Sequence, residues 1–376
     1  MQSWPMKILI VGNYRPDQQR SMMRFADMLV DNLRHAGVRA DLIIPAAIAN
    51  RWPGRAGRLA RLAANIDKYL FFPLVLRVKA RGYDCIHIVD HSNAPYAMFT
   101  AGRPTVLTCH DLFGIQVLRG DVPGTAFGLT GRMLQKLVLG RLRKARALTA
   151  VSENSRSELQ RLVNPRAAIA VVPNALSPCF APQQTVASGP RLSALNLGPG
   201  KAFFLHVGGN QWYKNRRGVL RLFEQLRLHA RFADHRLVFA GKAPDDDLCA
   251  AIAASSMGHA IDLVCGGTDA DLAALYGRAE ALLFVSLAEG FGWPIIEAQA
   301  CRCVVVASDL EPLKAIAGNA AVLVDPIDPI GAAAKIAKAY DSFPDMRARG
   351  AANAQRYDAA LVFRQYLPVY KAACAA

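Results

Sequence analysis

The sequence predicts an α/β fold made of two doubly wound parallel sheets. Short apolar segments alternate with helical patterns along the chain, and these segments fall into two series. A stretch rich in Pro, Gly, Ser and Ala separates the series at residues 175–201. Apolar strands that alternate with helices are typical of parallel sheets covered on both faces. Because a single sheet rarely holds eleven or more strands, we expect two domains.

The first series begins with "KILIV" at Lys7–Val11, followed by a helix from about Ser21 to Ala36. Each later segment of this series is apolar and leads to a loop. These further strands are predicted at Cys85–Asp90, Thr105–His110, Ala147–Ser152 and Ile169–Asn174. The series predicts a first domain over residues 1–178, with a linker at 179–199.

The second series predicts a domain over residues 200–357. Its strands are expected at Ala202–Gly209, Arg236–Lys242, Ile261–Gly267, Ala281–Ser286, Cys303–Ser308 and Ala321–Asp325. Ligands of such sheets bind beyond the carboxyl ends of the strands. The polar and glycine residues of interest follow those ends, and they include Gly12, Asn13, His110, Gly208, Gly209 and Glu289.

Composition excludes several classes of protein. The chain has 376 residues, of which 52% are hydrophobic, so it is globular rather than disordered. No apolar run approaches the ~20 residues that span a bilayer. The amino terminus runs directly into a predicted strand, so we expect no signal peptide. Eight cysteines are scattered without zinc or redox spacing, which favours reduced thiols in a cytoplasmic protein.

The formal net charge of +16 predicts anionic partners. At helical spacing, basic side chains around Arg61 and Lys68 share one side of a segment whose adjoining side carries Leu59, Leu62 and Leu70. This pattern fits an amphipathic helix on the inner face of a membrane, and it fits an ordinary surface helix equally well. Basic residues interleaved with aromatics, or a recognised reading module, are not visible, so nucleic acid is not expected.

The stretch "SLAEGFGWPIIEAQA" at residues 286–300 carries two carboxylates, Glu289 and Glu297, with seven residues between them. Gly290 and Gly292 allow a ligand to approach the backbone, and Pro294 suits the start of a helix. We place Glu297 in the first turn of that helix. Amides at a helix start attract phosphate, and carboxylates accept bonds from hydroxyls, which together suit a nucleotide sugar. A capped helix without ligand is the other interpretation.

The stretch "HVGGNQWYKN" places a Gly-Gly turn after a strand and Lys214 and Asn215 at the start of a helix. Gly208 and Gly209 can approach a diphosphate, and the Lys214 ammonium can neutralise it. The spacing matches neither a P-loop nor the G-x-G-x-x-G of dinucleotide-binding proteins, which weakens a nicotinamide interpretation.

Together, "EGFGWPIIEA" and the earlier "GG…KN" resemble family 4 of the retaining glycosyltransferases. The segments "LTCHDL", "AVSENSRSEL", "VVPNAL" and "AGNAAVLVDPIDP" resemble the family in the expected order. The resemblance implies the GT-B fold, in which two Rossmann-like domains face each other across a cleft. It also implies that the first domain serves the acceptor and that a carboxyl-terminal helix, about 358–376, crosses back onto it.

The resemblance implies a role for each matching residue. Glu297 would bond the ribose, Glu289 would contact the donor sugar, and Lys214 would stabilise the leaving diphosphate. His110 would contact the donor sugar from the first domain, and it is otherwise a satisfied loop histidine. The remaining donor-binding positions are Gly208, Gly209, Asn210, Asn215, Gly290, Phe291 and Gly292.

The sequence departs from the family at two loops. Many members carry an arginine where this chain has Gly209, and either Asn210 or Arg216 is the candidate replacement. The first-strand loop usually holds a glycine pair, whereas this chain continues from Gly12 and Asn13 into "YRPDQQRSM". We therefore expect Gln19 and Ser21 to donate bonds there, in an altered acceptor pocket.

The resemblance implies same-face displacement on a UDP- or GDP-sugar, with retention and without a metal or other cofactor. The acidic runs Asp245–Asp247 and Asp269–Asp271 precede helices, so capping is their expected role. The expected acceptor is a lipid-linked or cell-surface polysaccharide precursor. Two alternatives stay open: a nucleotide-sugar epimerase of the same broad fold, and a catalytically idle, membrane-associated binding protein.

Overall fold

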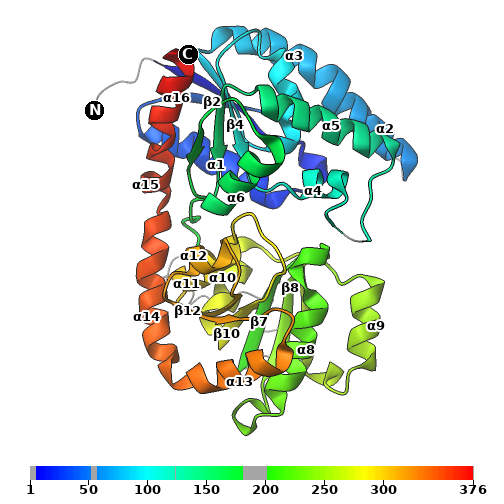
Figure 1. The fold of residues 1–376 in the computed structure, drawn as a ribbon, viewed down its shortest axis with the longest axis vertical. Coiled ribbons are helices and arrows are strands. Elements are labelled where there is room, and N and C mark those ends of the chain that lie inside the picture. Colours follow the sequence, from blue (N-terminus) through cyan, green and yellow to red (C-terminus); the bar gives the residue numbers. More distant parts are fainter. Residues whose placement is uncertain (1–5, 52–56, 123, 181–200, 376) are drawn as a thin grey trace. The chain divides into compact units, whose positions relative to one another are not determined.

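The computed structural model describes residues 6–51, 57–122, 124–180 and 201–375. The chain divides into two compact units (Figure 1). Unit 1 contains residues 1–175 and 359–376, and unit 2 contains residues 176–358. The linker predicted at 179–199 lies almost entirely outside the described residues.

Unit 1 is built on a six-stranded parallel sheet with the order β2-β1-β3-β4-β5-β6. Its strands are β1 (Lys7–Val11), β2 (Arg39–Ile43), β3 (Cys85–Ile88), β4 (Thr105–Cys109), β5 (Ala147–Ala150) and β6 (Ile169–Val171). Five of them were predicted. The sixth, β2, is an edge strand whose Arg39 and Asp41 are exposed, so it lacks the continuous apolar run that marks the others.

Helices cover the sheet of unit 1. They are α1 (Arg20–His35), α2 (Arg58–Ile66), α3 (Phe72–Lys79), α4 (Phe113–Arg119), α5 (Leu129–Lys144) and α6 (Glu153–Glu158). The π-helical turn η3 (Asp67–Phe71) joins α2 to α3, so residues 58–79 form one continuous helical segment. One core cluster joins Ile86, Leu107 and Leu148 of the sheet to helix residues such as Leu76 and Val138.

The carboxyl-terminal helices α15 (Ala359–Arg364) and α16 (Tyr366–Ala375) belong to unit 1. A buried hydrogen-bond network attaches α16 to His87 of β3 and Thr108 of β4. The Tyr370 hydroxyl lies 2.7 Å from Nδ1 of His87, and Thr108 Oγ1 lies 2.7 Å from its Nε2. Tyr366 packs against the same imidazole. The network connects residues 283 positions apart in the chain.

Unit 2 repeats the architecture with the order β12-β11-β10-β7-β8-β9, again all parallel. The strands are β7 (Phe203–Gly208), β8 (Arg236–Gly241), β9 (Ile261–Cys265), β10 (Ala281–Phe284), β11 (Val304–Ser308) and β12 (Ala321–Val324). The helices are α8 (Arg216–Arg227), α9 (Asp246–Ala254), α10 (Asp269–Arg278), α11 (Trp293–Ala300), α12 (Leu313–Ala317), α13 (Pro329–Ala339) and α14 (Phe343–Ala354). The predicted class of two doubly wound parallel sheets is confirmed.

The two acidic runs cap helices, as expected. Asp245 accepts a bond from the Leu248 amide at the start of α9. Thr268 and Asp271 form a capping box at the start of α10, in which each side chain accepts from the other's backbone N–H. Within the described ranges, no cluster of His, Cys, Asp and Glu has the arrangement of a metal site.

Candidate active site

In unit 2, the two predicted motifs meet at one edge of the sheet. β7 pairs directly with β10, and their register puts the two carboxyl ends side by side. The Gly-Gly loop follows β7, and the acidic loop follows β10. A backbone bond from the Leu287 amide to the Tyr213 carbonyl, 2.8 Å long, ties the second loop to the first.

Lys214 and Glu289 form an ion pair in which Nζ lies 2.7 Å from Oε1. Both side chains are largely withdrawn from solvent, with 16% of the lysine and 8% of the glutamate exposed. The ammonium also lies 5.0 Å from the centre of the Phe284 ring and 5.6 Å from that of Tyr213. The lysine is therefore held in one place by an anion and two aromatic faces.

The turn between the two glutamates requires glycine at its last position. Gly292 has φ of +109°, and a Cβ there would lie 2.7 Å from Cδ2 of Leu313. The buried Phe291 ring packs edge-on against Trp293 and Tyr357. α11 then begins at Trp293 with Pro294 in its second position, where the missing N–H leaves no bond unmade.

Glu297 lies in the second turn of α11, so its predicted place in the first turn is wrong. The helix begins at Trp293, which makes Glu297 its fifth residue. The side chain is buried, and its Oε2 accepts a 3.1 Å bond from the Tyr276 hydroxyl. Burial, and next the Glu297 carboxylate, raise the pKa of Tyr276 well above its usual value, so the tyrosine keeps its proton to donate.

The two candidates for the missing phosphate-binding arginine contact each other. Arg216 Nη1 donates to Asn210 Oδ1 and, over 3.3 Å, to the Lys242 carbonyl, and its guanidinium stacks on Phe239. Burial lowers the pKa of Arg216. Arginine side chains nevertheless stay protonated in proteins at neutral pH. A guanidinium therefore stands beside the loop that Gly209 leaves without one.

The Asn215 side chain stabilises the turn that precedes α8. Its Nδ2 donates to the Val285 carbonyl over 2.9 Å and to the Pro326 carbonyl over 3.1 Å. Its backbone has φ of +53°, a left-handed conformation that asparagine tolerates better than most residues. These bonds fix the turn from Lys214 into α8.

His206 was missed by the sequence analysis. It lies on β7, fully buried, and Nδ1 bonds to the Leu283 carbonyl over 2.9 Å. Nε2 has no hydrogen-bond partner among the described residues, and it lies 3.0 Å from where a Cβ on Gly208 would be. Burial lowers the pKa of His206 to about 3, so the ring is neutral with its lone pair facing the loop. The sequence signal that could have identified His206 is that it is the one polar residue in the apolar strand segment "FLHVGG".

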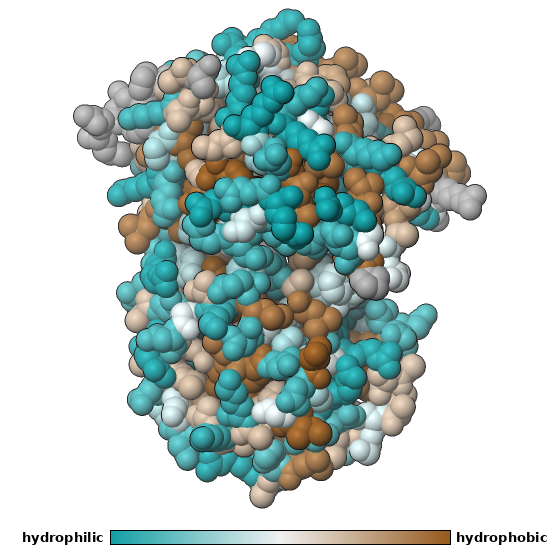
Figure 2. All heavy atoms as spheres, viewed as in Figure 1, coloured by the Kyte–Doolittle hydropathy of each residue, from teal (hydrophilic) through white to brown (hydrophobic). Residues whose placement is uncertain are grey.

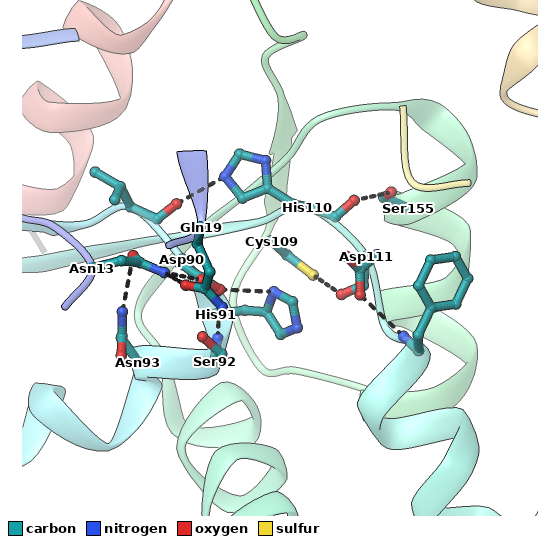
Figure 3. Close-up of polar contacts among 12 residues, drawn as sticks. Asn13, Gln19, Asp90, His91, Ser92, Asn93, Cys109, His110, Asp111 and Ser155 are labelled. Carbon is teal, nitrogen blue, oxygen red and sulfur yellow. Dashed lines mark hydrogen bonds and ion pairs between the residues drawn. The ribbon is translucent and has the colours of Figure 1, made fainter. Parts of the chain in front are cut away.

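Unit 1 carries a second polar cluster, at the carboxyl ends of β1 and β3 (Figure 3). Asn13 is buried and donates through Nδ2 to Gln19 Oε1 and to Asp90 Oδ2, the latter over 2.5 Å. Asn93 donates to Asn13 Oδ1 over 3.0 Å. The amide oxygen of Gln19 is thus used within the protein, and donation from its NH2 group to a ligand stays a prediction. Ser21 is exposed in the first turn of α1, and the Gly12 amide donates to the Ile43 carbonyl.

His110 follows β4 in the same unit and is buried beside this cluster. Its Nε2 donates to the Val89 carbonyl over 2.8 Å (Figure 3). Its ring also packs edge-on against Phe25. Burial lowers the pKa of His110, although the nearby Asp90 carboxylate opposes this shift. Burial alone raises the pKa of Asp90, but His91 and His110, with the bonds from Asn13 and Ser92, lower it overall. The cluster thus combines an ionised carboxylate with a neutral imidazole.

Comparison with known proteins assigns both units. The profile of the family described as Glycosyltransferase Family 4 matches residues 22–178, and that of Glycosyl transferases group 1 matches residues 193–357. The chain is a GT-B glycosyltransferase of the family 4 type.

The relatives of this glycosyltransferase include O-antigen chain mannosyltransferase B of Escherichia coli, 30% identical over 246 residues that cover 64% of each chain. A GDP-mannose:cellobiosyl-diphosphopolyprenol alpha-mannosyltransferase of Komagataeibacter xylinus is 29% identical over 163 residues, 40% of this chain and 42% of that one. The matched regions therefore span less than two thirds of either relative.

Solved structures resemble the glycosyltransferase over nearly its whole length. A sucrose-phosphate synthase from Thermosynechococcus elongatus superposes with a TM-score of 0.75 at 18% identity, covering 97% of this chain and 98% of that one. Anabaena HepE in complex with UDP and glucose gives a TM-score of 0.68 at 18% identity, covering 96% and 98%. At such identity the likeness establishes the shared fold and no more.

Proposed function

We propose that this protein transfers a mannosyl group from GDP-mannose to a hydroxyl of a lipid-linked or cell-surface polysaccharide precursor, with retention of the anomeric configuration. The observation that carries the proposal is the ion pair of Lys214 and Glu289 at the carboxyl edge of β7 and β10. A cation and an acid held side by side at this edge suit a diphosphate joined to a sugar.

The donor is bound by three kinds of group. The amides of Gly290, Phe291 and Gly292, at the amino terminus of α11, take sugar hydroxyls and the distal phosphate. Lys214 and the guanidinium of Arg216 neutralise the diphosphate. Glu297 accepts bonds from the ribose hydroxyls, and the bond from Tyr276 fixes the orientation of its carboxylate.

The reaction is a same-face displacement. The bond from the anomeric carbon to the phosphate oxygen breaks, and its electron pair leaves with the diphosphate. The acceptor oxygen forms the new bond on the same face, and its proton passes to the departing phosphate oxygen. Lys214 stabilises the negative charge that grows on the diphosphate, which is electrostatic catalysis without a metal.

Glu289 and His110 orient the donor sugar. Glu289 keeps one oxygen on Lys214 and turns the other to a sugar hydroxyl. His110 is neutral at physiological pH and its Nε2–H donates to the Val89 carbonyl, so Nδ1 accepts one bond from a sugar hydroxyl without adding a charge. The cluster of Asn13, Gln19 and Asp90 in unit 1 is the place we assign to the acceptor.

Mannose and GDP are favoured over other donors by the names of the relatives, among them O-antigen chain mannosyltransferases of Escherichia coli and Salmonella typhimurium. The relative from Komagataeibacter xylinus is named for GDP-mannose and for an acceptor on diphosphopolyprenol. We therefore propose a polyprenol-linked acceptor and a peripheral contact with the membrane that holds it. No helix among the described residues is both long and apolar enough to span a bilayer.

A panel of nucleotide sugars tests the proposal. Purified protein is incubated with GDP-mannose, UDP-glucose or UDP-N-acetylglucosamine, with EDTA present, and slow hydrolysis and transfer to a lipid-linked oligosaccharide fraction are measured. The expected result is turnover of GDP-mannose with an α-mannosidic product by NMR. An isomerised nucleotide sugar would support the epimerase alternative, and no binding to any nucleoside diphosphate would support the idle protein.

A further inference from the structure

Unit 1 has an uncovered apolar stripe along the helical segment 58–79. Leu59, Leu62, Leu70, Leu74 and Val78 follow one another at intervals of three, four or eight residues, and each is between 57% and 64% exposed. Other positions of the segment, among them Ala63 and Leu76, are buried. Figure 2 shows hydrophobic side chains at the edge of unit 1 where Figure 1 places α2 and α3. The exposed apolar residues of the stripe are thus distinct from the apolar residues of the same segment that pack in the core.

A parallel stripe runs along α5. Leu129, Met133 and Leu137 recur every four residues and are exposed. A groove of about 490 Å³ lies between the two stripes. Its lining comes from both sides: Asn65, Ile66, Tyr69 and Leu70, and Thr130, Gly131 and Leu134. We call the eight exposed residues of the two stripes the apolar face. Contiguous apolar surface of this extent marks a site of interaction.

The two helical segments that carry the apolar face are strongly basic. Residues 58–79 contain five basic side chains and a single acid, Asp67, which is buried and bonded to Tyr14 and to backbone amides. Helix α5 contains five basic side chains and no acid. Lys68 is paired with Asp17, but Arg132 and Lys136 are exposed beside Met133. A partner that binds the apolar face must therefore combine apolar groups with negative charges.

We infer that the apolar face docks on an anionic phospholipid bilayer, with the leucines among the acyl chains and the basic side chains among the head groups. Charge complementarity decides the occupant. A second copy would bring two basic surfaces together, whereas an anionic bilayer supplies both kinds of contact. The inference rests on the proposed function and deepens it, since docking would bring unit 1 to a polyprenol-linked acceptor. Vesicle binding is measured without donor or acceptor, so the docking test does not depend on the proposed activity.

Flotation of the full chain with vesicles tests the apolar contact. Wild-type protein is expected to float with phosphatidylglycerol-containing vesicles and to bind pure phosphatidylcholine at least tenfold more weakly. Leu62→Glu/Leu74→Glu should lower the affinity for the anionic vesicles more than tenfold. Ile327→Glu/Ile330→Glu is the matched control, because those isoleucines of unit 2 are even more exposed than the two leucines, and this variant should lose far less affinity than the first pair.

A second pair of double variants tests how much the basic side chains contribute to vesicle binding. Arg132→Ser/Lys136→Ser should weaken binding to anionic vesicles by roughly 25-fold, as expected for two basic residues near a charged surface. Lys335→Ser/Lys338→Ser removes the same charge from exposed positions on α13 and should leave the affinity within about threefold of wild type.

Three results would overturn the inference: equal binding to neutral and anionic vesicles, equal losses in the matched pairs, or no vesicle binding at all. Sedimentation that shows a dimer abolished by Leu62→Glu/Leu74→Glu would assign the face to a second copy instead. GDP-dependent thermal stabilisation is measured on the same variants. Stabilisation with failed flotation rejects only the docking surface, whereas flotation without stabilisation rejects only the proposed donor.

Discussion

Lys214 Nζ lies 2.7 Å from Glu289 Oε1, although the two residues are 75 positions apart and follow different strands. The contact exists because β7 and β10 are neighbours in a parallel sheet and end at the same edge. A charge pair with so little exposure is costly to desolvate, so it is better explained by a ligand than by stability alone.

Removal of the lysine should reduce turnover. Lys214→Ala is expected to lower kcat by at least about 10²-fold, the usual loss when one preorganised transition-state donor is removed. Steady-state kinetics with GDP-mannose measure this, and circular dichroism checks the fold. Arg217→Ala is the control, because that arginine is exposed on α8, paired with Asp247, and should be neutral. A wild-type kcat in Lys214→Ala would remove the lysine from the mechanism.

The two glutamates should respond oppositely to neutralisation. Glu289→Gln removes a negative charge beside the diphosphate, so GDP should bind about threefold to tenfold more tightly, a change on the order of 1 kcal/mol, while kcat falls. Glu297→Gln removes an acceptor for the ribose, so GDP should bind more weakly. Calorimetric titration with GDP measures both. The same direction of change in the two variants would contradict the assigned roles.

Gly292 should not tolerate a side chain. In Gly292→Ala the new Cβ would meet Leu313 in a backbone conformation that L-residues rarely adopt, so the free energy of unfolding should fall by about 1–3 kcal/mol. Urea denaturation measures the loss. Gly102→Ala shares a positive φ of +77° but has open space around it, so it should lose less. Equal losses would show that the contact with Leu313 is unimportant.

Acid should destabilise unit 2 through His206. Its pKa is about 3 in the folded protein and about 6.5 in the unfolded chain, so only the unfolded state gains a proton as the pH falls between these values. Stability is therefore lost as the pH falls from about 6.5 towards 3. His206→Asn keeps a donor for the Leu283 carbonyl but does not titrate. Between pH 6 and pH 4, wild type should lose about 2 kcal/mol more than this variant in denaturant titrations, and parallel losses would contradict a neutral His206.

The bond from α16 to the sheet should matter for unit 1. Tyr370→Phe leaves Nδ1 of the buried His87 without its partner, which should cost about 1–3 kcal/mol of the free energy of unfolding. Tyr83→Phe is the control, since the Tyr83 hydroxyl bonds to the exposed Asp41 and should matter little. Differential scanning calorimetry compares the two. Equal melting temperatures would mean that the Tyr370 hydroxyl does not help to hold α16 on the sheet.

Sequence patterns were sufficient to predict the strands whose residues are buried on both faces of the sheet. Eleven apolar strands were predicted because both faces of a parallel sheet are covered, and the motifs at 208–215 and 289–297 were found because they follow strand ends. β2 was missed because its edge position leaves Arg39 and Asp41 exposed. Glu297 was placed one residue too early, in the first turn, because a proline can stand in the second position of a helix as well as the first.

Other features depend on contacts that no local pattern carries. Asn13 and Asp90 are 77 residues apart, and their bond follows from the pairing of β1 with β3. The free Nε2 of His206 depends on which ring nitrogen reaches the Leu283 carbonyl, and that requires the packed sheet. The exposure of Leu62 and Leu74 likewise follows from which side of the helix meets the core.

The central claim is that the edge formed by β7 and β10 holds a nucleoside diphosphate. A crystal structure of the protein with GDP tests it most directly. The account predicts the diphosphate within hydrogen-bond distance of Lys214 Nζ and of the amides around Gly292, with the ribose hydroxyls on Glu297. A nucleotide bound elsewhere, with Glu297 still enclosed against Tyr276 and making no contact to it, would contradict the account.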